Sequence, residues 1–136
     1  MLGKMLTSHE IEIRVRYQET DAQGRVHHAN YLTWFELGRV ELMRAAGQNY
    51  RDLEAAGVFL VIAKAELKYH RGAVFDDLLK LRTTTVRAQG ARIDHRYEIL
   101  RGQELIAEGA TTLACVDREG RVSRLPEWLR VAERSP

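Results

Sequence analysis

The sequence contains a single cysteine, Cys115, among its 136 residues. One thiol cannot form an intramolecular disulfide, so the small disulfide-stapled folds of secreted proteins are excluded. The first residues, MLGKML, also lack the apolar stretch and the small-residue cleavage site of a signal peptide. We therefore expect a cytoplasmic protein.

Long hydrophobic runs are missing as well. The longest apolar stretch, AAGVFLVIA at residues 55–63, is far shorter than the roughly 20 apolar residues that a membrane helix needs. We expect no membrane span.

The chain has little net charge. It carries 21 Lys and Arg against 19 Asp and Glu, a formal charge of +2, without a basic block. This balance argues against nucleic acid as the main ligand. An anionic small molecule needs only a few well-placed basic side chains, and the candidates are Lys68, Arg71, Arg87 and Arg92.

The length predicts one domain, residues 1–136. Alternating apolar and polar residues predict a strand over 9–17, followed by a loop over 18–28 in which Gly24 can take a positive φ. A helix is predicted over 31–46, with Asn30 as its N-cap and Gly47 just beyond its end.

The second half of the chain is predicted to be mostly strands, after a short helix at 48–56. The predicted strands are 59–69, 78–88, 93–101, 105–116 and a short one at 121–124, with a terminal helix at 127–134. The breaks between the long strands are short enough for hairpins, so consecutive strands should pair antiparallel.

The apolar residues of the 31–46 helix cover about half of its circumference, which is too wide for a lightly packed surface helix. Arg39 falls within this arc and Glu36 lies three residues earlier, so we expect an ion pair between them. Gly38 should let another backbone approach closely. One buried helix followed by antiparallel strands predicts an α+β fold in which the sheet wraps around the helix, with open edges that favour a dimer.

The loop and the first half of the helix carry the pattern Y-x-x-T-D-x-x-G-x-V-x-H-x-N-Y-x-x-x-F-E-x-x-R-x-E, residues 17–41. This pattern resembles the signature of the hotdog-fold acyl-CoA thioesterases. More narrowly, it resembles the 4-hydroxybenzoyl-CoA thioesterase group and its relatives associated with the bacterial Tol–Pal system. The segment LKYHRGAVFDDLLKLRTTT at residues 67–85 extends the resemblance. The fold that it implies, an antiparallel sheet around one long central helix, is the one that the periodicity predicts.

The resemblance implies hydrolysis of the thioester of a small acyl-CoA, either aromatic or aliphatic of short or medium length. Asp21 matches the family's carboxylate, which is a nucleophile in some members and a general base in others. His28 matches the residue whose backbone N–H binds the oxyanion at the start of the helix. The residues expected to bind substrate are Tyr17, His27, Asn30, Tyr31, Lys68, Arg71, Arg87 and Arg92. No cofactor is implied besides the coenzyme A of the substrate, and relatives form homodimers or homotetramers.

Other interpretations of these residues remain open. A loop aspartate is more often a turn or capping residue than a catalytic group, and only the surrounding motif favours catalysis by Asp21. Some other hotdog enzymes carry the catalytic carboxylate on the central helix, but the expected pair with Arg39 favours a structural role for Glu36. His27 and His28 should diverge, and without metal-ligand spacing we expect no metal. Cys115, within a strand, should be a small core residue.

The main alternative function is a hotdog protein that binds acyl-CoA without hydrolysing it, as a sensor or scaffold; a dehydratase on the same fold is a third option. A pure binding protein does not need a carboxylate that repels an anionic ligand. Asp21 therefore favours the enzyme.

Overall fold

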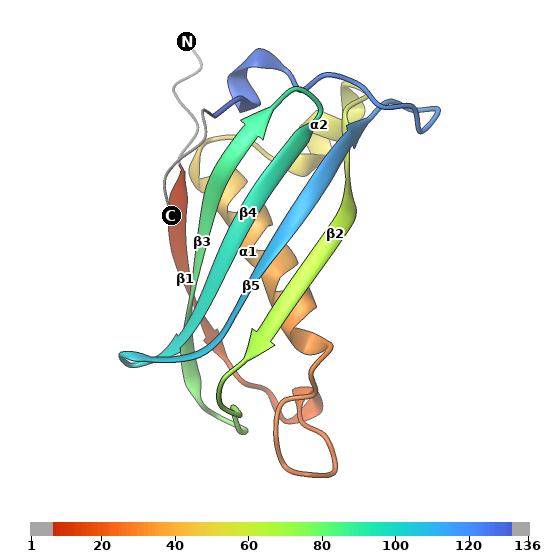
Figure 1. Ribbon diagram of the computed structural model, residues 1–136. Coiled ribbons are helices and arrows are strands. Elements are labelled where there is room, and N and C mark those ends of the chain that lie inside the picture. Colours follow the sequence, from red (N-terminus) through yellow and green to blue (C-terminus); the bar gives the residue numbers. More distant parts are fainter. Residues whose placement is uncertain (1–6, 132–136) are drawn as a thin grey trace.

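The structure is a computed structural model that describes residues 7–131. Its strands are β1 (Ser8–Arg14), β2 (Phe59–Tyr69), β3 (Leu78–Gln89), β4 (Arg92–Arg101) and β5 (Glu104–Val116), and its helices are α1 (Asn30–Ala45) and α2 (Tyr50–Ala55). The strands form one antiparallel sheet in the order β1-β3-β4-β5-β2. Figure 1 shows this sheet curving around α1, with β1 and β2 at its two edges. The predicted α+β hotdog fold is confirmed.

The inner face of the sheet is made by alternate residues of each strand, as the pleat requires. In β4 the buried residues are Ile93, His95, Tyr97 and Ile99. The ring of Tyr97 stacks on Phe35 of α1, with the ring centroids 4.1 Å apart. This aromatic stack lies in the main hydrophobic cluster, between α1 and the middle of the sheet.

Gly38 is where α1 lies closest to β3. A Cβ atom at this position would overlap Thr83 Oγ1 and would lie 2.8 Å from Leu81 Cδ2. The predicted close approach at Gly38 is confirmed, and any side chain there would force the helix away from the sheet.

The predicted boundaries of β1 and α1 need correction. β1 ends at Arg14, and the chain turns at Tyr17–Glu19 in a short 3-10 helix because the Glu19 carboxylate accepts from the Arg16 N–H at 2.7 Å. The N-cap of α1 is Ala29. The predicted cap, Asn30, lies inside the helix and donates from Nδ2 to the Glu19 carbonyl oxygen at 2.8 Å.

The predicted elements at the end of the chain are also shorter than expected. The strand at 121–124 is reduced to one bridge between Val122 and Val116. The terminal helix is a 3-10 turn, Glu127–Leu129, because Val131 bridges back to Ala88 in β3 and draws the chain into an extended form. Residues 132–134 of that prediction lie outside the described part of the chain. None of the helices within residues 7–131 is long and apolar enough to cross a membrane.

Candidate active site

The loop between β1 and α1 folds into a small hairpin, residues 19–27, which we call the Asp21 hairpin. Its arms are joined by hydrogen bonds from Asp21 N–H to the Arg25 oxygen and from His27 N–H to the Glu19 oxygen, both 2.8 Å long. Gly24, with φ of 80°, closes the turn at its tip. The hairpin carries Asp21 at this turn, and its second arm leads directly to His28 and α1.

A second turn of the protein has the same backbone geometry as the tip of this hairpin. The sequences are DAQGR at residues 21–25 and DREGR at residues 117–121. In each turn the aspartate Oδ1 accepts from the N–H two residues later at 2.9 Å. In each turn the aspartate N–H donates to the arginine oxygen at 2.8 Å. The turn itself therefore explains why an aspartate stands at position 21.

The two aspartates differ in what their carboxylates contact. Asp117 also accepts from the Arg121 N–H at 2.9 Å and forms an ion pair with the Arg121 guanidinium at 3.4 Å. Asp21 has only the Gln23 contact, and its second carboxylate oxygen has no hydrogen bond or ion pair within residues 7–131. Half of the Asp21 carboxylate is thus free to contact a ligand or a water molecule.

His28 lies just before Ala29, the N-cap of α1. Its backbone N–H donates no hydrogen bond within the described part of the chain. Its carbonyl oxygen accepts from the Tyr69 hydroxyl at 3.1 Å and from the Tyr31 N–H at 3.4 Å. Unpaired amides at a helix N-terminus, together with the positive end of the helix dipole, favour a negatively charged oxygen.

Glu19 is a residue of this site that the sequence analysis missed. Its side chain is buried and accepts hydrogen bonds from the Arg16 N–H at 2.7 Å and from Trp34 Nε1 at 3.0 Å. Burial alone would raise the pKa of Glu19, but the Arg16 and Trp34 hydrogen bonds outweigh it and lower this pKa. No local pattern indicates such a role, because a loop glutamate is usually solvated.

The two histidines beside the helix do not diverge as predicted. The rings of His27 and His28 stack with their centroids 4.2 Å apart. The Ala29 N–H donates to His27 Nδ1 at 3.2 Å and holds this ring beside its neighbour. Within residues 7–131, no group of three or more His, Cys, Asp or Glu side chains is gathered closely enough to hold a metal ion.

Tyr17 and Tyr31, the two tyrosines expected to bind substrate, differ in their exposure to solvent. Tyr17 is 77% exposed and packs edge-to-face on Phe75, with the ring centroids 5.6 Å apart. Tyr31 is buried and packs against Tyr69 and Trp34. Burial, and then the neighbouring Tyr69, raise the pKa of Tyr31, so its hydroxyl stays protonated at neutral pH. Tyr17 is accessible to a ligand, whereas the Tyr31 ring is buried against its aromatic neighbours.

The four predicted basic residues lie at two ends of the sheet. Lys68 and Arg71 are at and just after the end of β2, at the same end as the Asp21 hairpin, whereas Arg87 and Arg92 flank the β3–β4 turn at the opposite end (Figure 1). Arg71 is paired with Glu104 at 2.7 Å and Arg92 with Asp94 at 2.9 Å. Lys68 is exposed and has no ion pair within the described residues. At the end of the sheet that carries the hairpin, Lys68 is therefore the one of these four cations without a carboxylate partner among residues 7–131.

A groove of about 280 Å³ runs between α1 and the strands β2 and β5. Its lining residues are Leu32, Thr33, Glu36, Arg39, Ile62, Ala65 and Thr111. The predicted Glu36–Arg39 ion pair is wrong: Glu36 is exposed at this groove, and Arg39 Nη1 donates instead to the Tyr97 hydroxyl at 3.2 Å. The Arg39 side chain lies on the buried face of α1, whereas Glu36 lies on the solvent side.

Known proteins share the fold of this chain. Residues 15–132 match the family model described as the thioesterase-like superfamily. The chain therefore belongs to that superfamily, and its fold is the hotdog fold of thioesterases.

Two named relatives are acyl-CoA thioesterases. The acyl-CoA thioesterase YbgC of Haemophilus influenzae is 33% identical over 106 residues, covering 77% of this chain and 78% of its own. The acyl-CoA thioester hydrolase YbgC of Escherichia coli O157:H7 is 31% identical over 106 residues, covering 77% and 79%. The structure of a DHNA-CoA thioesterase from Staphylococcus aureus superposes with a TM-score of 0.84 at 30% identity, covering 88% of this chain and 82% of that one.

Proposed function

We propose that this protein hydrolyses the thioester of a small acyl-CoA, aromatic or short- to medium-chain aliphatic, with Asp21 as its carboxylate and the His28 N–H as its oxyanion donor. One observation carries the proposal. Among the described residues, the Asp21 carboxylate, with one oxygen unpaired, lies on the hairpin, and the unpaired His28 N–H lies where the hairpin leads into α1. The matched turn at Asp117 has no free carboxylate oxygen, so the turn alone does not account for the free oxygen of Asp21.

The reaction needs a group that attacks the thioester carbonyl and a donor for the oxygen that becomes negative. As a general base, Asp21 would take a proton from water while the water oxygen attacks the carbonyl carbon. The negative oxygen would then accept from the His28 N–H, and the C–S bond would break as the thiol leaves with that proton. As a nucleophile, Asp21 would form a mixed acyl anhydride with release of the thiolate. Water would then split this anhydride into the free acid and the Asp21 carboxylate, and the proton set free would pass to the thiolate.

The substrate has a suitable place beside these groups. The groove along α1 starts near the helix N-terminus and is lined partly by apolar side chains such as Leu32 and Ile62, which suits an acyl group. Tyr17, His27 and Asn30 are the residues of the hairpin region that would contact the substrate. The phosphates of coenzyme A would meet Lys68 first, because Arg71 and Arg92 already have carboxylate partners. No cofactor besides the coenzyme A of the substrate takes part in this scheme.

The protein is expected to assemble as a homodimer or homotetramer. β2 is an edge strand of 11 residues, and its Val61 and Ile62 are 45% and 50% exposed. Leu32 and Leu37 of α1 are also exposed, at 41% and 42%. An open apolar edge of this kind favours pairing with a second copy. Such a dimer would cover the groove, and it is the arrangement in which Arg87 and Arg92 could approach a ligand.

We place the reaction in the cytoplasm, since the one cysteine, Cys115, is buried and unpaired.

The test is release of free thiol from a panel of acyl-CoAs, aromatic and aliphatic of graded length, by the wild type, Asp21→Asn and Asp117→Asn. The two variants make the same chemical change in the same kind of turn. We expect Asp21→Asn to lose on the order of 10²–10⁴-fold in kcat, the usual contribution of a catalytic acid–base group. Asp117→Asn should keep the wild-type rate.

Equal rates in the three proteins would overturn the assignment of Asp21. If no acyl-CoA is hydrolysed while calorimetry detects binding, the protein is an acyl-CoA-binding sensor or scaffold. Sedimentation that finds a stable and active monomer would contradict the proposed assembly.

A further inference from the structure

The Asp21 hairpin does not stand alone: its second arm pairs with the loop between β2 and β3, residues 70–77. The Val26 N–H donates to the Ala73 oxygen at 2.9 Å, and Arg25 forms an antiparallel bridge with Val74. Arg25 is also the residue whose carbonyl oxygen accepts from the Asp21 N–H. Two backbone contacts thus join the β2–β3 loop to Arg25 and Val26, and Arg25 is in turn hydrogen-bonded to Asp21.

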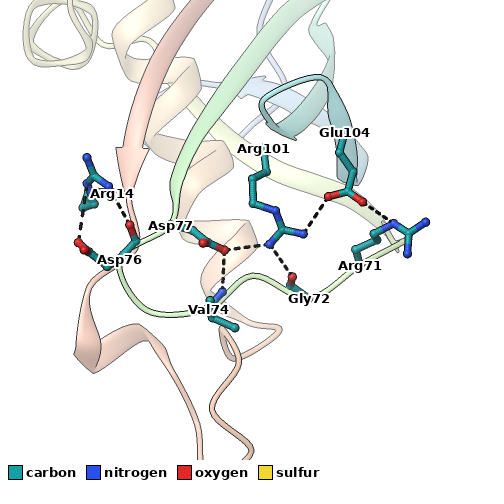
Figure 2. A network of polar contacts seen from close by, with 8 residues as sticks. All are labelled: Arg14, Arg71, Gly72, Val74, Asp76, Asp77, Arg101 and Glu104. Carbon is teal, nitrogen blue, oxygen red and sulfur yellow. Dashed lines mark hydrogen bonds and ion pairs between the residues drawn. The ribbon is translucent and has the colours of Figure 1, made fainter.

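The two ends of this loop are held by backbone hydrogen bonds: the His70 and Arg71 N–H groups donate to the Ile106 oxygen, and the Asp76 N–H donates to the Val15 oxygen. Between these ends, a side chain from another part of the sheet crosses the loop. Arg101, at the end of β4, donates from Nη1 to the Gly72 oxygen at 3.1 Å and to Asp77 Oδ2 at 2.9 Å. Gly72 lies before the paired segment of the loop and Asp77 lies after it. Asp77 Oδ2 also accepts from the Val74 N–H at 3.0 Å. Figure 2 shows the guanidinium reaching across the loop between these two partners.

Arg101 is itself fixed from the opposite side. Its Nη2 donates to Glu104 Oε1 at 2.9 Å across the β4–β5 turn, and Glu104 Oε2 pairs with Arg71 Nε at 2.7 Å (Figure 2). The hydrogen bonds that Arg101 donates to Glu104, and then to Asp77, raise the pKa of Arg101. The side chains of Arg101 and Asp77 are only 33% and 19% exposed, so solvent screens this pair less than it screens an open surface pair.

We infer that Arg101 is a positioning residue for Asp21: its guanidinium clamps the β2–β3 loop, and that loop sets the second arm of the Asp21 hairpin. The inference rests on the proposed role of Asp21 and adds a partner for it from outside the motif. A catalytic group must be held within a fraction of an ångström of its working position, and a misplacement of about 1 Å can cost on the order of 10²-fold in rate. Loss of the clamp should therefore lower kcat and leave substrate affinity nearly unchanged.

The chain offers a matched control for this clamp. Arg82 in β3 bridges Glu10 at 2.7 Å and Glu98 at 3.0 Å, so it also joins two carboxylates across neighbouring strands. Its side chain is 41% exposed, close to that of Arg101. It contacts neither the β2–β3 loop nor the Asp21 hairpin in the structure. A stability effect common to such arginines should appear in both variants, whereas a positioning effect should appear only at Arg101.

The experiment compares Arg101→Gln, Arg101→Lys, Asp77→Asn and Arg82→Gln with the wild type, using kcat and KM from thiol release and amide hydrogen exchange over residues 19–28. We expect Arg101→Gln to lower kcat roughly 10–100-fold, with KM within about twofold, and to speed exchange in the hairpin. Asp77→Asn should act in the same direction, and Arg101→Lys should recover part of the rate because a lysine can still reach one acceptor. Arg82→Gln should change neither kcat nor exchange.

The inference is overturned if Arg101→Gln lowers kcat no more than Arg82→Gln does, or if hairpin exchange is unchanged. If Arg101→Gln does not fold, Asp77→Asn carries the same test with a smaller change.

Asp21→Asn and the double variant Asp21→Asn/Arg101→Gln separate this inference from the proposed function. A wild-type rate in Asp21→Asn refutes the proposed function itself. A large loss in Asp21→Asn, with a further independent loss in the double variant, refutes only the positioning role, because a residue that acts through Asp21 should add little once Asp21 is gone.

Discussion

The indole Nε1 of Trp34 donates a hydrogen bond to the buried carboxylate of Glu19 at 3.0 Å, which ties the base of the Asp21 hairpin to the first turns of α1. The same glutamate accepts from the Arg16 N–H and, through its carbonyl oxygen, from His27 N–H and Asn30 Nδ2. One acidic residue thus connects the segment that follows β1, the hairpin and the helix. The geometry of the candidate site depends on this buried charge keeping all of its donors.

Replacing Trp34 by Phe should destabilise the protein by about 1–3 kcal/mol, because a buried carboxylate would lose one of its hydrogen-bond donors. Urea unfolding at neutral pH measures this loss. Trp128→Phe is the control, since Trp128 is half-buried and its side chain makes no hydrogen bond within residues 7–131. Equal losses in both variants would show that ring size, and not the hydrogen bond, carries the effect.

Gly38→Ala should also destabilise the fold, by about 1–3 kcal/mol, although alanine favours a helix over glycine. The added Cβ would overlap Thr83 Oγ1 and lie 2.8 Å from Leu81 Cδ2, both in the packed interior. Gly72→Ala is the comparison, because the nearest atom there is Arg25 Cδ at 3.0 Å, on a flexible exposed side chain. Thermal unfolding of the two variants measures the difference. A Gly38→Ala protein as stable as the wild type would mean that α1 can move away from β3 freely.

Tyr69→Phe should lower kcat by roughly threefold to tenfold with little change in KM, as expected for slight misplacement of a reacting group. The variant removes the hydroxyl that donates to the His28 carbonyl oxygen at 3.1 Å and keeps the ring against Tyr31. The His28 peptide would then be less firmly held beside the helix. Tyr50→Phe, in α2 at the other end of the molecule, should leave kcat unchanged. Identical rates for wild type and Tyr69→Phe would contradict the role given to this contact.

The elements that could be predicted from the sequence are those determined by regular burial. The alternation at Ile11 and Ile13 and the wide apolar arc of α1 follow directly from which faces meet the core, and both predictions are confirmed. Gly38 and Gly47 were also assigned correctly, one to close packing and one to a positive φ. The periodicity of apolar residues follows from which of them are buried, so it predicts sheet layers and buried helix faces well.

Polar contacts over long sequence distances could not be predicted in this way. Arg39 was expected to pair with Glu36, its neighbour on the helix, but its partner is Tyr97, 58 residues away. Arg101 and Asp77 showed no pattern in the sequence, and their contact exists only because the β4–β5 turn and the β2–β3 loop meet in the fold. The motif predicts roles for Asp21 and His28, whereas the residues that hold the hairpin are evident only in the structure.

His95 should make the protein lose stability as the pH falls from 7.5 to 5. Burial, and then the nearby charge of Arg39, lower the pKa of His95 from 6.5 to about 3, while Asp94 opposes this shift weakly. Below pH 6.5 the unfolded chain therefore binds a proton at this residue that the folded protein does not accept. Because the unfolded state binds more protons, the free energy of unfolding falls by about 2 kcal/mol between pH 7.5 and 5.

Urea unfolding at these two pH values in wild type, His95→Gln and His9→Gln separates this effect from other titrations. His95→Gln cannot titrate at this position, so its stability should change less between the two pH values, whatever its absolute stability. His9→Gln, which alters a half-buried histidine on β1, should keep the full wild-type difference. The pKa of Glu19 is lowered from 4.5, so its contribution is lost only at lower pH and does not enter this window. A wild-type pH difference in His95→Gln would mean that other groups cause the loss.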